Sequence, residues 1–264
     1  MARAVAAPAS APAPQPWLAG ACAEVEAALQ AIARPARGEA VRIDRGSQMV
    51  HLGIPVPELR ARVRAGFSFD ARPHPEQLAV WDALWRTTRH ADVLLAAVEH
   101  WVPRLRQEVP PGLWPVVRHW ADRVDNWCVS DALSGLYARL LQTQFDDLHP
   151  QLQRWNAGTA LWPRRLSLTS LVQAWGRDAV FLPAATMRPL LDTCANDHRH
   201  YIQLALGWVL RELGRANAAA ADAYLLDHAG TLGAKAWARA LEKRTATERA
   251  AWAGRRRAAT DRAG

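Results

Sequence analysis

The segment Val124–Asp131, which reads VDNWCVSD, opens the most strongly patterned helix of this chain. After it, apolar residues recur at the three- and four-residue spacing that places them on one side of an α-helix. They are Val129, Ala132, Leu133, Leu136 and Leu140. At about 100° per residue, Trp127 and Asp131 fall on the opposite side, one turn apart. We therefore expect a helix whose apolar stripe faces a core and whose other face carries an indole and a carboxylate.

Asp125 and Asp131 differ in the structural roles open to them. Asp125 precedes the helix, and we expect it to cap the helix by accepting hydrogen bonds from the free amides of the first turn. Asp131 lies inside the helix and has no such role. Two interpretations remain open for Trp127 and Asp131. Either the ring packs on a neighbouring helix and the carboxylate is solvated, or both belong to a functional site.

The composition indicates a globular protein from a reducing compartment. Half of the 264 residues are apolar, enough for a sizeable core. No stretch of about 18 uncharged apolar residues exists, and the Ala/Pro-rich start lacks the features of a secretory signal, so we expect a cytoplasmic protein. Three scattered cysteines, Cys22, Cys128 and Cys194, argue against a disulfide framework.

The chain is also strongly basic. Lys and Arg number 33 against 25 Asp and Glu, a formal net charge of +8, and most of the positive charge is arginine. The planar guanidinium suits phosphate, so nucleic acid is the expected partner. A high-GC coding bias that raises both Arg and Ala is the alternative explanation. We expect most of the thirteen tryptophans to be buried, because so much indole area in water would favour aggregation.

Helical periodicity extends from about residue 17 to residue 245, with breaks at Pro or Gly and no convincing strand. About a dozen short helices with short loops predict an all-α fold, an α-solenoid of antiparallel HEAT-like helix pairs with a basic concave face. We expect a disordered Ala/Pro arm at 1–16, the solenoid at 17–245 and a basic flexible tail at 246–264. Candidates for the basic face are Arg60, Arg62, Arg118, Arg123, Arg164, Arg165, Arg211 and Arg215.

Two further segments have features of a ligand site. Trp162-Pro163-Arg164-Arg165 is typical of a helix start, where amide hydrogens and guanidinium groups converge on an anion. Two cations at that end of a helix require something anionic nearby, because the helix dipole disfavours them. The alternative is two solvated arginines at a helix end. Gly207, within the segment LGWVLRE at 206–212, weakens a helix interior, so we expect it to permit close approach of a neighbouring helix or ligand.

Four motifs, in the same order, resemble the DNA alkylation repair enzyme family of HEAT-repeat DNA glycosylases. Val124–Asp131 resembles the central family motif, in which a tryptophan and an aspartate stand four apart. Residues 162–165 resemble its tryptophan-led basic helix start, and residues 206–212 its late Gly-Trp segment. His51-Leu52-Gly53-Ile54-Pro55 with Pro57-Glu58 resembles its early Leu-Gly-Ile segment. The resemblance covers about residues 20 to 245.

The resemblance implies a role for each matched residue. Asp131 corresponds to the carboxylate that supports the reaction centre. Trp127 and Trp208 correspond to the two indoles that embrace the deoxyribose of the lesion, and Arg165 to the arginine that grips the nearby backbone. Further DNA contacts are expected from Arg164, Arg211 and Arg123.

This chain departs from the family pattern at two places. Asp44 stands eight residues before the Leu-Gly-Ile segment, where the family often carries a DNA-contacting tyrosine, and an acid there would repel a phosphate. Cys128 and Ser130 replace an acidic and an aliphatic residue of the central motif. The second departure is either neutral or marks a subfamily with another lesion or no activity.

The expected function is that of a monofunctional DNA glycosylase. It would excise cationic alkylated purines (N3-methyladenine, N7-methylguanine or bulkier adducts) from duplex DNA without base flipping and without a cofactor. We expect a monomer at the bacterial nucleoid, with no membrane contact. Cys194, His198 and His200 lie close together but lack further ligands, so we expect no metal. The alternatives are a non-catalytic HEAT-repeat protein that binds DNA structures and a protein-binding scaffold.

Overall fold

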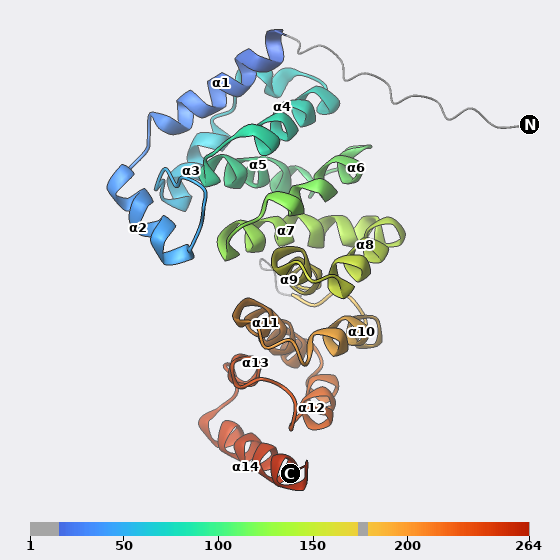
Figure 1. Ribbon diagram of the computed structural model, residues 1–264. Helices are drawn as coiled ribbons and strands as arrows, with labels where there is room; N and C mark the ends of the chain where they lie inside the picture. The colour runs from blue at the N-terminus through green and yellow to red at the C-terminus, as the bar shows by residue number, and fades with distance from the viewer. Residues whose placement is uncertain (1–15, 174–178, 264) are drawn as a thin grey trace, which may run out of the picture.

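The computed structural model describes residues 16–173 and 179–263. These residues form helices stacked in two layers, with no strand between them (Figure 1). One layer consists of α3 (Val56–Arg64), α5 (Ala91–Arg104), α7 (Trp127–Thr143), α9 (Leu161–Thr169), α11 (His200–Ala216) and α13 (Ala234–Ala240). The other consists of α1 (Pro16–Gln30), α4 (His74–Thr87), α6 (Leu113–Val117), α8 (Phe145–Ala157), α10 (Ala184–Cys194) and α12 (Ala218–Asp227).

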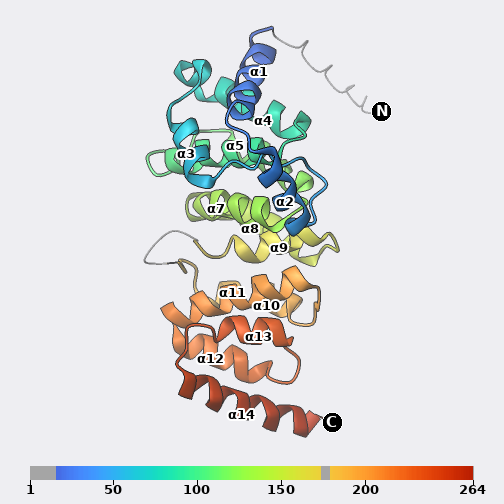
Figure 2. The ribbon, with the colours of Figure 1, turned by 90° about the vertical axis from the view of Figure 1, so that its left-hand side faces the viewer.

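Two helices and two 3-10 turns complete the chain. They are α2 (Pro35–Arg45), α14 (Ala246–Ala263), η1 (Ser68–Ala71) and η2 (Arg118–Arg123). In Figure 1 the left-hand outline of the stack is concave, with α2 above and α14 below. Figure 2 looks onto that side, where α7, α9, α11 and α13 follow one another. The predicted all-α solenoid is confirmed.

The C-terminal segment is a helix where we expected a flexible tail. Trp252 is buried and packs on Trp237, with ring centroids 6.0 Å apart. The Arg256 guanidinium lies over the Trp237 ring and donates to the Leu232 carbonyl (2.6 Å). The Trp252 indole thus supplies an apolar contact that the Ala/Arg-rich composition of this segment did not indicate. The α14 helix covers the end of the stack. The expected disordered arm lies outside the described residues, apart from Pro16, which begins α1.

Most tryptophans form the core, as predicted. Seven of the twelve described are buried, and the rings of Trp85 and Trp120 stack with centroids 4.3 Å apart. Trp127 and Trp208 are only half-buried. Within the described ranges, no helix is both long and apolar enough to cross a membrane.

The early Leu-Gly-Ile segment fixes α2 against α5. The buried Asp92 carboxylate, in the first turn of α5, accepts from the amides of Leu52 (2.7 Å) and Ile54 (3.1 Å). Gly53 has a φ of 75°, and a Cβ there would lie 2.4 Å from the backbone nitrogen of Gly38 in α2. Only glycine fits at this crossing, so the motif holds α2 at the edge of the concave side.

Candidate active site

The start of α7 is capped by Asn126, not by Asp125 as we expected. Asn126 has extended backbone (φ −149°, ψ 161°), and its Oδ1 accepts from the amides of Cys128 (3.0 Å) and Val129 (3.1 Å). The cap is the last residue outside the helix, and Asp125 stands one residue too early for it.

Asp125 instead joins α7 to the segment that follows α2. Its carboxylate accepts from Ser47 Oγ (2.8 Å) and from the amides of Gln48 (2.7 Å) and Met49 (3.2 Å). Asn126 Nδ2 also donates to it (2.7 Å). The first turn of α7 and the end of α2 are therefore hydrogen-bonded into one unit.

The amphipathic pattern of α7 is confirmed. Its stripe residues Val129, Leu133, Leu136 and Leu140 are fully buried, and Ala132 lies at the edge of the stripe. Trp127 and Asp131 lie off the stripe and are half-buried. Cys128 is half-buried too, and burial raises the pKa of its thiol, so it is protonated at neutral pH and is no ready nucleophile.

Asp131 forms an ion pair with Arg165 of α9. Arg165 donates to Asp131 Oδ1 from Nη2 (2.7 Å) and from Nε (3.2 Å), and Nη1 donates to the Tyr201 carbonyl (2.5 Å). The Arg165 side chain is 5% exposed, whereas that of Asp131 is 29% exposed. Both bonds end on Oδ1, so Oδ2 has no hydrogen-bond partner in the described residues. Arg165 therefore holds one oxygen of the carboxylate, and the other oxygen is available to a ligand.

Opposing effects act on the charge of Asp131. Burial raises the pKa of its carboxyl above the ordinary value, because an anion is less stable away from water. The positive charges of Arg165 and Arg239 lower this pKa, and the hydrogen bonds from Arg165 lower it further. Arg165 thus favours the ionised form of a carboxyl that its surroundings would otherwise protonate.

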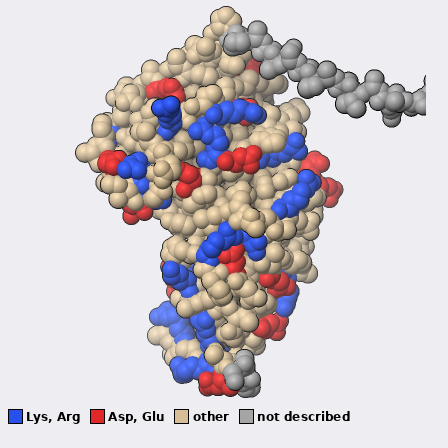
Figure 3. Space-filling model, in the orientation of Figure 1, with Lys and Arg blue, Asp and Glu red and all other residues tan. Residues whose placement is uncertain are grey.

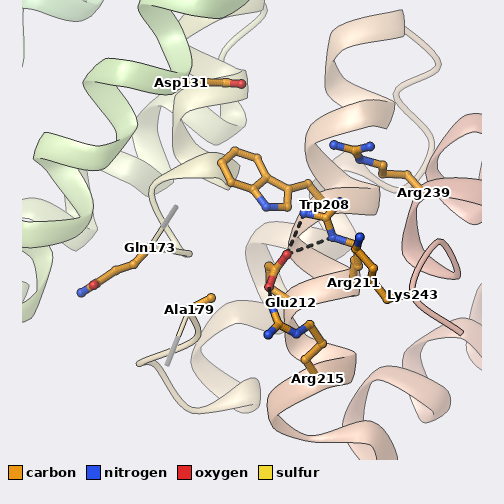
Figure 4. A pocket seen from close by; sticks show the side chains of 9 residues that line it. All are labelled: Asp131, Gln173, Ala179, Trp208, Arg211, Glu212, Arg215, Arg239 and Lys243. Carbon is orange, nitrogen blue, oxygen red and sulfur yellow. Dashed lines mark hydrogen bonds and ion pairs between the residues drawn. The ribbon is translucent and has the colours of Figure 1, made fainter. Parts of the chain in front are cut away.

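A cavity of about 340 Å³ opens in front of Asp131, between α7, α11 and α13 (Figure 4). Its lining residues are Asp131, Gln173, Ala179, Trp208, Arg211, Glu212, Arg215, Arg239 and Lys243. In Figure 4 the Trp208 indole lies between Asp131 and the charged group formed by Arg211, Glu212 and Arg215. The structure therefore brings Asp131, Trp208 and Arg211 to one cavity, with Trp127 one turn before Asp131 on α7.

Glu212 is a second carboxylate in this cavity, but it is already bound. It accepts from Arg211 (2.7 Å) and from Arg215 (3.0 Å), and its side chain is 7% exposed. Arg211 also donates to Glu242 (2.7 Å). Both oxygens of Glu212 therefore accept charge-assisted hydrogen bonds from the protein itself, which leaves this carboxylate occupied.

The two arginines at the start of α9 form ion pairs with carboxylates of the protein itself. Arg165 pairs with Asp131, and Arg164 pairs with Asp197 (3.0 Å) and donates to the Gly158 and Thr193 carbonyls. These carboxylates supply the negative charge that the sequence required at this helix end. Whether Arg164 and Arg165 also contact DNA stays a prediction.

Other arginines expected on the concave face are likewise engaged within the protein. Arg123 donates to the carbonyls of Trp85 and Thr88 at the end of α4, and Arg60 pairs with Glu99 (2.9 Å). On the side seen in Figure 3, basic and acidic groups are intermingled, with basic ones gathered at lower left over the last helices. DNA contacts of Arg123 and Arg211, and the basic concave face, stay predictions.

Gly207 permits the close approach of a helix, one of the two outcomes expected for it. A Cβ at Gly207 would lie 2.6 Å from the Ala236 carbonyl oxygen and 2.6 Å from Arg239 Cβ, both in α13. The contact sets how closely α13 lies to α11. It therefore fixes the distance between Trp208 and Arg239 across the cavity.

Sequence reasoning did not single out Glu212, Arg239 or Lys243 as site residues. Glu212 follows Trp208 by four residues, a helical spacing that could have placed both on one face. Arg239 and Lys243 come from another helix, and no local pattern links them to Asp131. Among the described residues, no group of three or more His, Cys, Asp or Glu side chains could hold a metal ion.

The fold and the site define a helical solenoid with a carboxylate, indoles and arginines around one cavity. Residues 25–244 match the model of the family described as "DNA alkylation repair enzyme", and the chain belongs to that family. A solved structure titled "Predicted DNA alkylation repair enzyme from Enterococcus faecalis" is similar, with a TM-score of 0.67 and 14% identity. The match covers 81% of this chain and 97% of that one, and at this identity it shows the fold. No curated protein matches the chain.

Proposed function

We propose that this protein is a monofunctional DNA glycosylase that hydrolyses the N-glycosidic bond of cationic alkylated purines in duplex DNA. The observation that carries the proposal is the Asp131–Arg165 pair, a half-buried carboxylate fixed by a buried arginine at an open cavity beside Trp208. Membership of the family supports DNA as the partner. We further propose that the protein acts as a monomer and that its helix pairs are HEAT-like repeats.

The reaction breaks the bond between C1′ of the sugar and the base nitrogen. The electron pair leaves with the base, and positive charge develops on the sugar. The Asp131 carboxylate and the faces of Trp127 and Trp208 stabilise that charge. Asp131 Oδ2, which is open, orients a water molecule that adds to C1′ and gives its proton to the carboxylate or to solvent. The products are the free base and an abasic site.

The cavity suits a base that leaves without being protonated. Both oxygens of Glu212 are occupied by hydrogen bonds from two arginines, and no histidine lines the described part of the cavity. General acid catalysis would contribute a factor of about 10² to 10⁴, so a site without it depends on a leaving group that is already activated. N3-methyladenine and N7-methylguanine carry a positive charge and leave as neutral bases.

The lining also supports a reaction without base flipping. A flipped base is ordinarily held between aromatic or apolar side chains, whereas among the described residues Trp208 is the one aromatic that lines the cavity. A closed pocket discriminates against one added methylene by roughly 10- to 200-fold. Without such a pocket, the larger adduct N7-(2-hydroxyethyl)guanine should be excised about as fast as N7-methylguanine. A loss of rate in that range would indicate a closed base pocket.

The charge of the cavity suits a DNA backbone. Among the described residues that line the cavity, four cationic side chains outnumber two carboxylates, and Lys243 has no ion pair with any of the described residues. Arg165 is assigned a positioning role through Asp131. The expected backbone contacts of Arg165, Arg164, Arg211 and Arg123 remain part of the proposal.

Incubation with duplex DNA carrying N7-methylguanine, followed by alkaline cleavage at abasic sites, tests the proposal. Strand cleavage that depends on the protein and is faster than spontaneous depurination is expected. Binding of the duplex without any excess of abasic sites would instead favour the non-catalytic DNA-binding alternative.

A further inference from the structure

Arg45 is a cation at the edge of the site that none of the roles above uses. It is the last residue of α2, and its guanidinium carbon lies 5.3 Å from the centroid of the Trp127 ring. Trp127 is one of the two indoles proposed to contact the sugar of the lesion. Arg45 therefore lies beside a residue of the proposed site, on a helix that contributes no other site residue.

The position of Arg45 relative to Trp127 is fixed. Gly46 ends α2 in the left-handed conformation (φ 58°). The next residues, 47–49, are held by the Asp125 carboxylate, directly before the cap of α7. Guanidinium and indole thus stand on two segments that are hydrogen-bonded together, so a ligand that contacts Trp127 meets Arg45 as well.

The hydrogen-bond donors of Arg45 are unused within residues 16–173 and 179–263. A guanidinium has five N–H donors, and Nε of Arg45 is shielded from water without a partner. Arg42, three residues earlier on the same helix, differs sharply. Its Nε and Nη2 both donate to Glu39 at 2.8 Å. Arg45 is therefore the cation at this end of α2 that remains available to an outside anion.

The surroundings do not neutralise Arg45. No ion pair joins it to Asp44, which is exposed, among the described residues. The oxygens of Asp125 are occupied by residues 47–49. Burial, with the positive charges of Arg45 and Arg42 acting in the same direction, lowers the pKa of His51, so that ring is neutral at pH 7. An unpaired guanidinium on a partly desolvated ring face favours a phosphate, which it can bind through two parallel N–H bonds.

We propose that Arg45 binds a backbone phosphate next to the lesion while it holds the Trp127 indole in place. The proposal rests on the proposed function, because it takes the ligand to be DNA. Each deoxyribose in a strand lies between two phosphates, so a cation stacked on the indole that contacts the sugar meets one of them. The carboxylate of Asp44 would repel a phosphate, whereas the guanidinium of the next residue, Arg45, would attract it.

The first test compares Arg45→Met with Arg42→Met. Methionine keeps an apolar chain on the indole and removes the charge, and Arg42 is the matched control because its charge is paired. The dissociation constant of an undamaged duplex is measured against salt concentration. The log–log slope should fall by about 0.9 for Arg45→Met, the value for one phosphate contact, and stay unchanged for Arg42→Met. An unchanged slope in Arg45→Met overturns the proposal.

The second test locates the phosphate. Duplexes carry a stable tetrahydrofuran abasic analogue and one neutral methylphosphonate at each flanking position in turn. At one position the substitution should weaken binding by the wild type but not by Arg45→Met, because both changes remove the same contact. Losses that simply add at every flanking position would contradict the proposal. If Arg45→Met does not fold, Arg45→Gln serves as the neutral variant.

Excision of N7-methylguanine is measured separately. A wild type that binds DNA but excises nothing contradicts the glycosylase proposal, and the slope and coupling still decide the role of Arg45. A wild type that excises while Arg45→Met keeps the full slope contradicts only the role of Arg45.

Discussion

Asp131 is the residue on which two opposed effects meet. Burial favours its neutral form, and Arg165 favours its ionised form. Arg165 can do so because it is itself buried and bonded to the Tyr201 carbonyl, so its guanidinium cannot turn away to solvent. A carboxylate that is ionised but poorly hydrated stabilises a nearby developing cation more strongly than a solvated one does. The proposed chemistry depends on both residues.

Asp131→Asn should separate chemistry from binding. Asparagine keeps the size of the side chain and removes the charge that opposes the developing cation. By analogy with the loss of one preorganised stabilising group, excision of N7-methylguanine should fall by about 10²-fold or more. Affinity for the duplex, measured by fluorescence anisotropy, should change little. Excision at the wild-type rate would show that Asp131 serves only its ion pair with Arg165 and takes no part in the chemistry.

The pH profile should show the raised pKa of Asp131. Excision needs the ionised carboxylate, so kcat/KM should fall about tenfold per pH unit below that pKa, which lies above the ordinary aspartate value. The titration of Asp131 does not itself destabilise the fold along this limb. A group whose pKa is raised in the folded state makes folding more favourable, not less, as the pH falls through it.

Arg165 should move that acid limb. Because Arg165 favours the ionised form, Arg165→Met should shift the limb to higher pH, and Arg165→Lys, which keeps the charge, should shift it less. The residual activity of Asp131→Asn should show no limb in this range. An Arg165→Met enzyme with reduced activity but an unshifted profile would mean that the arginine serves structure or DNA binding instead.

At the scale of helices, the site depends on how closely α11 and α13 pack. Gly207 lets the α13 backbone approach the helix that carries Trp208, and the same approach brings Arg239 to the cavity opposite Asp131. Two effects compete when this glycine is replaced. Alanine favours the helix by about 1 kcal/mol, and overpacking costs about 1–3 kcal/mol. Because a backbone carbonyl cannot rotate away from the added methyl group, we expect the cost of overpacking to exceed the gain in helix stability.

Gly207→Ala should therefore destabilise the protein and disturb the cavity. The melting temperature should fall, and excision should fall by more than the loss of folded protein explains. Gly20→Ala in α1 is the matched control, since a Cβ there meets nothing within 4 Å and the helix gains stability. Equal effects of the two substitutions on melting temperature would contradict the close contact.

At the scale of the whole molecule, binding should depend on many weak phosphate contacts along the concave side. Several arginines expected there are engaged within the protein: Arg60 and Arg164 in ion pairs, and Arg123 in hydrogen bonds to backbone carbonyls. The available cations at the cavity are fewer, with Lys243 among them. The net charge of +8 still favours association with a polyanion, and salt weakens it.

Duplex affinity should thus fall steeply with salt. The log–log slope should correspond to several contacts at about 0.9 each. Lys243→Gln should lower it by about one contact, whereas Arg86→Gln should not, because Arg86 pairs with Asp82 on α4 of the other layer. An affinity almost independent of salt would contradict a basic DNA-binding face.

The solenoid could be predicted because helical periodicity is local. The spacing of Val129, Leu133 and Leu136 determines which side of α7 faces the core. It therefore also predicts that Trp127 and Asp131 lie off that side. Partnerships across the stack were beyond such patterns. The Asp131–Arg165 pair joins residues 34 positions apart, and Asp125 binds residues 76 to 78 positions earlier in the chain. The α14 helix escaped prediction because a single buried indole, Trp252, supplies its packing.

The most direct measurement compares excision of one cationic and one neutral lesion by the wild-type protein. Duplexes identical except for N7-methylguanine or hypoxanthine are incubated side by side, and abasic sites are counted over time. Because no general acid is found among the described residues that line the cavity, excision of hypoxanthine should be slower by a factor of about 10² to 10⁴ or undetectable. Comparable rates for the two lesions would show that a group in the site protonates the leaving base, and would contradict a site built for bases that are already charged.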